Sequence, residues 1–183
     1  MSRVGIFLAD GFEEIEGLTV VDILRRAGID ISMISINGKK KVTGAHGIAL
    51  DTDEDIVQCD PDKLDMLVLP GGMPGTTNLA ACEKLTEALK KADQEKRGIA
   101  AICAAPSVLG DLGFLKGKKA VCYPGFESRL TGVKVLAVPV VTDGHITTSR
   151  GMGTAIAFAL ELTKRLKDEE TAKQVSRSIL YNV

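Results

Sequence analysis

The sequence contains no tryptophan, only two histidines, and few aromatic residues of any kind. Aromatic residues make up 4% of the 183 residues, so the core is expected to consist mainly of aliphatic side chains. No apolar run reaches the roughly 18 residues that a membrane-spanning helix needs, so no membrane partner is expected. The formal net charge is −1, without a basic stripe or tail, so a nucleic-acid partner is not indicated.

The four cysteines form no C-x-x-C pair, and neither histidine lies at metal-ligand spacing from them, so no metal site is expected. They are Cys59, Cys82, Cys103 and Cys122. The N-terminal residues pass directly into a strand-like run, without the apolar region of a secretory signal. These features predict a cytoplasmic protein with reduced thiols. The length predicts one domain over residues 1–183.

Short apolar runs alternate with segments of helical periodicity along most of the chain. Residues 4–8, 13–27 and 29–36 read as a strand, a helix and a second strand, which is the start of a βαβ unit. Residues 64–69 and 99–102 read as two more buried strands. This alternation predicts an α/β fold with a mostly parallel central sheet and helices on both faces.

The segment around Cys103 reads as a buried strand that ends at a cysteine and leads at once into a helix. Pro106 suits the first turn of that helix. Ala101 and Ala105 are small enough for a tight strand-to-helix elbow. Such an elbow places the cysteine over a helix N-terminus, whose amides and dipole favour a thiolate. Cys103 is therefore a candidate nucleophile, and an inert buried cysteine is an equally weighted alternative.

Two other segments are expected at the same edge of the sheet, because ligands of open parallel sheets bind beyond the carboxyl ends of the strands. One is the loop with Gly71 and Gly72. Their amides would hold a developing oxyanion, or they would only form a turn that needs positive φ. The other is the helix start with Glu13, Glu14 and Glu16, whose charges suit the helix dipole. One of these acids would instead face the sulfur and carry a proton, and spacing does not choose among them.

The two histidines are expected at the surface or at an edge of the fold. His46 lies within residues 37–56, which are interpreted as a hairpin excursion, and His145 follows a turn. Neither adjoins Cys103 in the sequence. A cysteine–histidine dyad is therefore not indicated locally, although an approach in space stays open.

Five motifs, in this order, make the chain resemble the DJ-1/PfpI family, specifically its DJ-1/ThiJ/YajL-like branch. They are residues 9–16 (ADGFEEIE), 21–28 (VDILRRAG), 68–72 (VLPGG), 100–106 (AAICAAP) and 148–154 (TSRGMGT). Together they span nearly the whole chain, and their order is more specific than any one motif. The resemblance implies a flavodoxin-like three-layer sandwich without a cofactor, usually a homodimer.

The same resemblance implies roles for individual residues. Cys103 is the reactive cysteine, and Glu16 is its partner carboxyl, protonated and hydrogen-bonded to the sulfur. The other implied site residues are the backbone donors Gly71, Gly72 and Ala104, the pocket-lining residues Tyr123 and Pro124, and the dimer-interface residues Arg26 and Arg150.

Two departures from the family's patterns restrict the expected activity. Ala104 stands where protease-type relatives carry a histidine, so peptidase activity is not expected. Tyr123 stands before Pro124, where some members carry a histidine, so a mechanism that needs that imidazole is not supported. The resemblance implies an enzyme for small reactive dicarbonyls, a glutathione-independent glyoxalase, or a deglycase of glycated proteins or nucleotides. The alternative is an oxidative-stress sensor or chaperone that acts through oxidation of Cys103.

Overall fold

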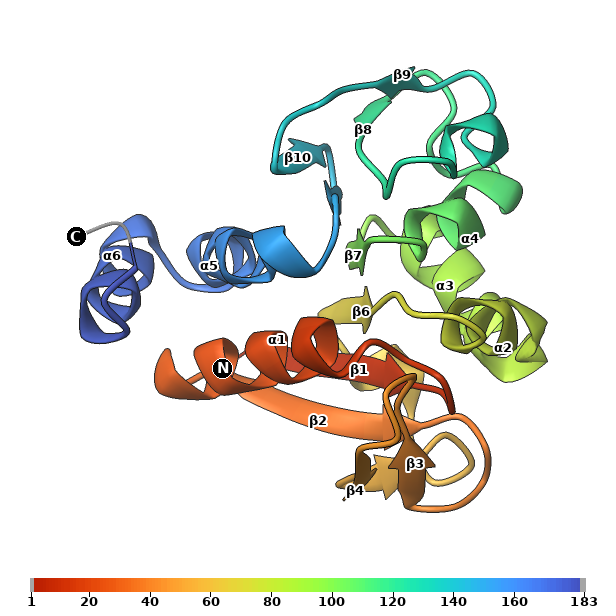
Figure 1. Cartoon of the computed structure of the whole chain (residues 1–183), viewed down its shortest axis with the longest axis horizontal. Helices are drawn as coiled ribbons and strands as arrows, with labels where there is room; N and C mark the ends of the chain where they lie inside the picture. Colours follow the sequence, from red (N-terminus) through yellow and green to blue (C-terminus); the bar gives the residue numbers. More distant parts are fainter. Residues whose placement is uncertain (1, 182–183) are drawn as a thin grey trace.

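A seven-stranded sheet lies between two layers of helices in the computed structural model, which describes residues 2–181 (Figure 1). The strand order is β10-β11-β7-β6-β1-β2-β5. All neighbouring pairs in it are parallel except β10 and β11. The strands of this sheet are β1 (Arg3–Leu8), β2 (Asp30–Ser35), β5 (Glu54–Asp55), β6 (Met66–Leu69), β7 (Gly98–Ile102), β10 (Val140–Asp143) and β11 (Ile146–Ser149). The predicted α/β fold with a mostly parallel sheet is confirmed.

Six α-helices cover the sheet, and two hydrophobic clusters fill the space between the layers. Alternate side chains of β1 point to opposite faces, so Ile6 belongs to one cluster and Phe7 to the other. The Ile6 cluster is covered by α1, α5 and α6, and the Phe7 cluster by α2, α3 and α4. The helices are α1 (Glu14–Arg26), α2 (Gly75–Ala81), α3 (Glu83–Gln94), α4 (Pro106–Asp111), α5 (Ala155–Leu166) and α6 (Glu169–Ser178). Within residues 2–181, no helix has the length and apolarity to cross a membrane.

The predicted hairpin is present as a separate antiparallel pair, β3 (Lys41–Thr43) and β4 (Ala49–Asp51). It is tied to the loop between β1 and α1. The amide of Gly11 donates to the carbonyl of Thr43 at 2.8 Å, and the amide of Ala45 donates to the carbonyl of Phe12 at 2.8 Å. The tip of the hairpin therefore lies beside the start of α1.

Two features differ from the sequence-based expectation. Helix α2 is not predicted, because a glycine and two threonines in its first turn have low helix propensity. It is held by tertiary contacts, such as the 3.0 Å hydrogen bond from the amide of Gly75 to the carbonyl of Gly11. The short apolar run at residues 119–122 also predicts a strand, but only β8 (Lys119–Ala120) forms there, and it pairs with β9 (Lys134–Val135) in a sheet of its own.

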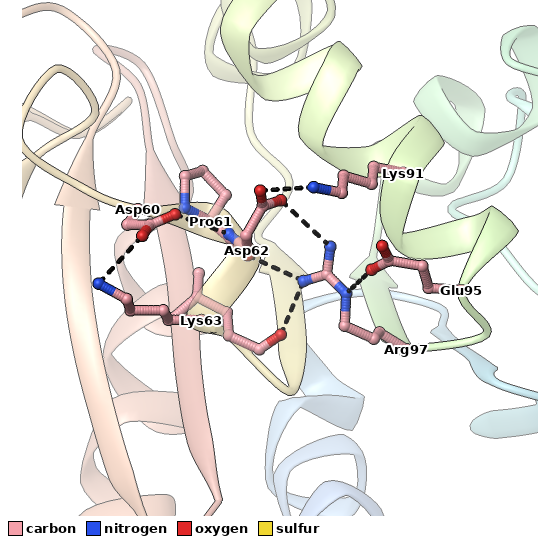
Figure 2. Close-up of polar contacts among 8 residues, drawn as sticks. Asp60, Pro61, Asp62, Lys63, Lys91, Glu95 and Arg97 are labelled. Carbon is pink, nitrogen blue, oxygen red and sulfur yellow. Dashed lines mark hydrogen bonds and ion pairs between the residues drawn. The ribbon is translucent and has the colours of Figure 1, made fainter.

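A polar cluster joins the segments before β6 and β7, at the edge of the sheet opposite the carboxyl ends (Figure 2). Nη1 of Arg97 donates to the carbonyls of Pro61 and Leu64, each at 2.8 Å. Its Nε donates to Glu95 at 2.7 Å. Asp62 pairs with Lys91 of α3 in the same cluster. Arg97 therefore fastens the 3-10 turn η1 (Pro61–Lys63) to the start of β7.

Candidate active site

The loops that follow β1, β6 and β7 meet at the carboxyl edge of the sheet, as the predicted topology requires. The amide of Glu13 donates to the carbonyl of Gly71 at 2.8 Å. A Cβ on Gly72, where φ is +91°, would lie 2.3 Å from the backbone nitrogen of Glu13. The glycine pair is needed for this close approach of two backbones, which a side chain would prevent.

Cys103 occupies the elbow between β7 and α4 with a φ of +66°, a conformation uncommon for a residue with a side chain. Two backbone hydrogen bonds hold it there. Its amide donates to the carbonyl of Ser149 at 3.0 Å, and its carbonyl accepts from the amide of Tyr123 at 2.8 Å. Ala101 and Ala105 are fully buried on either side. The sharp turn lifts the Cys103 side chain away from the sheet toward the α1 loop.

The structure brings Glu16, rather than Glu13 or Glu14, to the sulfur of Cys103. Glu16 lies in the first turn of α1, and its side chain is 1% exposed. Its carboxyl faces the Cys103 side chain, because a Cβ on Gly71 would lie 2.7 Å from Oε2 of Glu16 and 2.5 Å from Cβ of Cys103. Oε2 accepts the amide of Gly71 at 2.9 Å, whereas Oε1 is buried and has no hydrogen-bond partner among the described residues.

The ionisation of these two groups is coupled, because each opposes a second negative charge in the same buried space. Burial raises the pKa of Glu16 to about 7, against hydrogen bonds from Cys103 and the Gly71 amide. Burial, the charge of Glu16 and the hydrogen bond to Glu16 raise the pKa of Cys103 to about 12. The backbone amides of Ala104 and Gly72 act in the opposite direction and lower the pKa of Cys103. The expectation that the elbow alone favours a thiolate is therefore wrong: burial outweighs the helix amides, and the sulfur ionises most readily when Glu16 holds the proton.

Cys103 and Glu16 open into a cavity of about 660 Å³. The predicted site residues that line it are Cys103, Glu16, Gly72, Ala104, Tyr123, Pro124 and Arg150. Glu13, one of the three candidate acids, also lines it, together with residues that were not predicted: His46, Met73, Phe126 and Gly151 to Thr154. Arg26 does not line it, because its guanidinium pairs with Asp22 at 2.6 Å on the exposed side of α1.

Gly71 departs from the role expected of it. It does not line the cavity, and its amide donates to Glu16 rather than pointing toward a substrate. The backbone amides that lower the pKa of the sulfur are those of Ala104 and Gly72. Tyr123 covers Gly151 with its ring, since a Cβ on Gly151 would lie 3.2 Å from Cδ2 of that tyrosine.

The histidines are placed only partly as the sequence suggests. His145 lies in the turn between the edge strand β10 and β11, but it is only 9% exposed and its Nε2 lies 2.8 Å from Oδ1 of Asp93, so a surface position for it is wrong. His46 is exposed but also lines the cavity. Sequence spacing gave no signal for this, because the hairpin must first fold back onto the α1 loop.

The same corner holds the one group in residues 2–181 that places three potential metal-ligand atoms within 4.8 Å of one another, from Glu13, Glu14 and His46. Nδ1 of His46 lies 3.0 Å from Oε2 of Glu14 and 3.5 Å from Oε2 of Glu13. The first distance is that of a direct hydrogen bond. We therefore interpret the group as a hydrogen-bonded ion pair.

The other three cysteines are also free, but none of them lines the cavity. Burial is the main cause that raises the pKa of both Cys59 and Cys122 to about 11. Cys82 is half-buried at the start of α3. Cys103 differs from them in its access to an open cavity and in its carboxyl partner.

Comparison with known proteins finds one family model and several relatives. The model of the DJ-1/PfpI family matches residues 2–165. Protein DJ-1 homolog A of Arabidopsis thaliana is 39% identical over 176 residues, which are 94% of this chain and 45% of that protein. The chain thus spans less than half of that curated relative's length. A deglycase of Pyrococcus abyssi is 34% identical over 167 residues, covering 90% of this chain and 99% of that protein. The structure of oxidized Toxoplasma gondii DJ-1 matches with a TM-score of 0.96 and 34% identity, covering 100% of both chains.

Proposed function

The chain belongs to the DJ-1/PfpI family, and from that premise we propose that it is a cysteine-dependent enzyme acting on small reactive dicarbonyls such as methylglyoxal and glyoxal. The observation that carries this proposal is the pairing of Cys103 with the buried carboxyl of Glu16 in an open cavity. The Pyrococcus abyssi relative is named a deglycase, which supports an enzymatic function for this chain. The activity would need neither glutathione nor a metal ion.

The proposed reaction uses the two side chains in separate steps. The Cys103 thiolate adds to the aldehyde carbon and forms a hemithioacetal, while the Gly72 and Ala104 amides stabilise the negative charge on oxygen. Once the sulfur is bound to the substrate and carries no charge, Glu16 releases its proton to solvent and ionises. The carboxylate then takes the proton from that carbon and returns it to the adjacent carbonyl carbon, which gives a 2-hydroxyacyl thioester. Water cleaves the thioester, so the products are lactate or glycolate and free Cys103.

The same chemistry extends to early glycation adducts of proteins or nucleotides, in which the dicarbonyl is already joined to an amino group. A cavity of about 660 Å³ has room for more than a three-carbon substrate. The rim is partly apolar, because Met73, Tyr123 and Met152 are each at least half exposed. We therefore include a deglycase activity in the proposal.

The test is an assay of lactate formation from methylglyoxal by the purified protein. Cys103→Ala and Glu16→Gln should each lower kcat/KM at least about 100-fold, because they remove the nucleophile and the proton carrier. Cys82→Ala is the matched control, since this thiol lies outside the cavity, and it should retain wild-type activity. Full activity of Cys103→Ala would refute the mechanism.

A second candidate function, a sensor of oxidative stress or a chaperone regulated by oxidation, is favoured by the access of Cys103 to the cavity. The Toxoplasma gondii relative is described in an oxidized form. Accessible cysteines with thiolate character oxidise before buried ones. After mild peroxide treatment, mass spectrometry should find oxygen on Cys103 before Cys59, Cys82 or Cys122. Equal oxidation of all four would contradict this function.

We also propose that the chain acts as one domain in a homodimer in the cytoplasm. On α1, Ile15 is 50% exposed and Leu18 is 37% exposed, which is apolar surface that a second copy would cover. Arg26 lies on the same helix, and Arg150 is proposed at the interface with it. The four free thiols fit a reducing compartment. Analytical ultracentrifugation of wild type and Leu18→Glu would test the dimer.

A further inference from the structure

The tip of the β3–β4 hairpin encloses the side chain of Glu14, at the rim of the cavity that contains Cys103. Glu14 passes directly beneath Gly44, because a Cβ on that glycine would lie 2.2 Å from Cδ of Glu14. The amide of Gly44 donates to the carbonyl of Ile48 at 2.9 Å and closes the tip. The hairpin therefore holds His46 against the first turn of α1.

Glu14 is a buried carboxylate whose two oxygens have different partners. Its side chain is 2% exposed. Oε1 accepts the amides of His46 and Ile48 at 2.8 and 3.4 Å, and Oε2 lies 3.0 Å from Nδ1 of His46. Burial by itself would raise the pKa of Glu14, but the hydrogen bonds from the His46 ring and from backbone amides outweigh it and lower the pKa. Glu14 therefore stays ionised and accepts the proton on Nδ1.

A carboxylate bound to Nδ1 leaves Nε2 as the nitrogen that exchanges protons with its surroundings. Among residues 2–181, Nε2 of His46 has no hydrogen-bond partner, and the ring lines the cavity shared with Cys103 and Glu16. The hydrogen bond to Glu14 and the charges of Glu13 and Glu14 raise the pKa of His46. These contacts therefore favour the imidazolium form of His46.

We propose that His46, oriented by Glu14, transfers protons to and from the oxygen atoms of the substrate at Cys103. Glu16 transfers protons to and from the carbon atoms of the substrate. This inference rests on the proposed function. It places an imidazole at the site from the β3–β4 hairpin, because His46 lines the cavity that contains Cys103.

The proton balance closes over one cycle. The imidazolium of His46 donates a proton to the aldehyde oxygen as the thiolate adds, which leaves a neutral ring. Glu16, which held a proton while the sulfur was ionised, now releases that proton to solvent. Its carboxylate then converts the hemithioacetal into its isomer, the thioester, without net gain or loss of protons in that step. The neutral ring takes a proton from the water that attacks the thioester carbon, the carbon–sulfur bond breaks, and the thiolate leaves. The acid product gives its proton to Glu16, so Cys103, Glu16 and His46 return to their starting states, and one proton per cycle is released to solvent.

The charged and titratable groups that face His46 set its pH dependence. Glu13 and Glu14 lie beside it at the start of α1, and Glu16, Cys103 and Arg150 line the same cavity. Glu14→Gln removes the carboxylate that raises the pKa of His46. The part of the pH–rate profile in which kcat changes with the titration of this ring (the His46 limb) should therefore move to lower pH. Because Glu16 also titrates near neutrality, assigning the limb requires variants of both partners of the ion pair.

The experiment is the pH profile of kcat and KM for methylglyoxal, measured for the wild type, His46→Gln and Glu14→Gln. His145→Gln is the control, because this second histidine bonds to Asp93 outside the cavity. His46→Gln should lower kcat about 100-fold, which is in the range of lost acid–base catalysis. It should also abolish the limb of the pH–rate profile that Glu14→Gln shifts to lower pH. KM should change less. A profile of His46→Gln that superimposes on the wild type would overturn the proposal, as would loss of wild-type activity in EDTA.

A second measurement does not depend on turnover. The side-chain resonances of the two histidines are recorded by NMR before and after Cys103 is alkylated with iodoacetamide. The proposal requires a proton on Nδ1 of His46, and a shift of its Nε2 resonance on alkylation that His145 does not show. An unchanged His46 would overturn the proposal. If the wild type fails to turn over methylglyoxal, the proposed function fails, and the response of His46 still decides whether a proton carrier lies beside the sulfur.

Discussion

The backbone amide of Gly71 donates a 2.9 Å hydrogen bond to Oε2 of Glu16, and this contact fixes the acid beneath the sulfur of Cys103. The contact joins the loop after β6 to the first turn of α1, 55 residues apart in the sequence. It is possible because position 71 has no side chain. The glycine therefore orients the carboxyl rather than the substrate.

Gly71→Ala should inactivate the enzyme by displacing both reactive groups. The added Cβ would lie 2.5 Å from Cβ of Cys103, 2.7 Å from Oε2 of Glu16 and 3.0 Å from the carbonyl oxygen of Ile102. A displacement of about 1 Å at reacting groups can lower a rate about 100-fold, so we expect kcat/KM for methylglyoxal to fall by at least that factor. Circular dichroism would check that the variant is folded. A folded Gly71→Ala protein with wild-type kcat/KM would contradict the positioning role.

Much of the fold follows from local patterns, whereas the chemistry of the site depends on contacts between distant segments. The apolar runs predict β1, β6 and β7, and parallel topology predicts that the residues after them converge. Spacing alone does not select Glu16 from three neighbouring acids, because the choice depends on the position of the Gly71 amide. His46 is not recognisable as a cavity residue, since its partner Glu14 is 32 residues away and the hairpin must fold back first. Burial of Cys103 and Glu16, which decides their ionisation, is likewise a tertiary property.

Arg97→Ala should lower the stability of the fold without changing the cavity that contains Cys103 and Glu16. The substitution removes the guanidinium donor from the carbonyls of Pro61 and Leu64, and a hydrogen bond to a charged group contributes about 2 kcal/mol. We expect the free energy of unfolding to fall by at least about 2 kcal/mol in urea titrations. Lys63→Ala is the matched control in the same cluster (Figure 2), because its ion pair with Asp60 is solvent-exposed and contributes less than about 1 kcal/mol. Equal effects of the two substitutions would contradict the role given to Arg97.

Glu16→Gln should make Cys103 easier to ionise, even though it abolishes proton transfer. Apart from burial, the causes that raise the pKa of Cys103 are the negative charge of Glu16 and the hydrogen bond to it. Glutamine removes the charge. The pH midpoint for alkylation of Cys103 by iodoacetamide should therefore shift downward, and the thiol should titrate as a single group instead of as half of a coupled pair. A midpoint that stays at the wild-type value, or rises, would show that Glu16 does not oppose ionisation of the sulfur.

Glu16 should also make the stability of the protein depend on pH between about 4.5 and 7. Its pKa is raised from 4.5 to about 7 by burial, so over this range the folded state binds more protons than the unfolded state. The free energy of unfolding therefore falls as pH rises through this window, and the full penalty is present above pH 7. One pKa unit corresponds to about 1.4 kcal/mol, so this shift corresponds to about 3 kcal/mol. Glu16→Gln cannot ionise, and its stability relative to the wild type should be about 3 kcal/mol more favourable at pH 8 than at pH 4 in urea titrations. A difference that is the same at both pH values would mean that the folded protein does not hold this carboxyl in its protonated form.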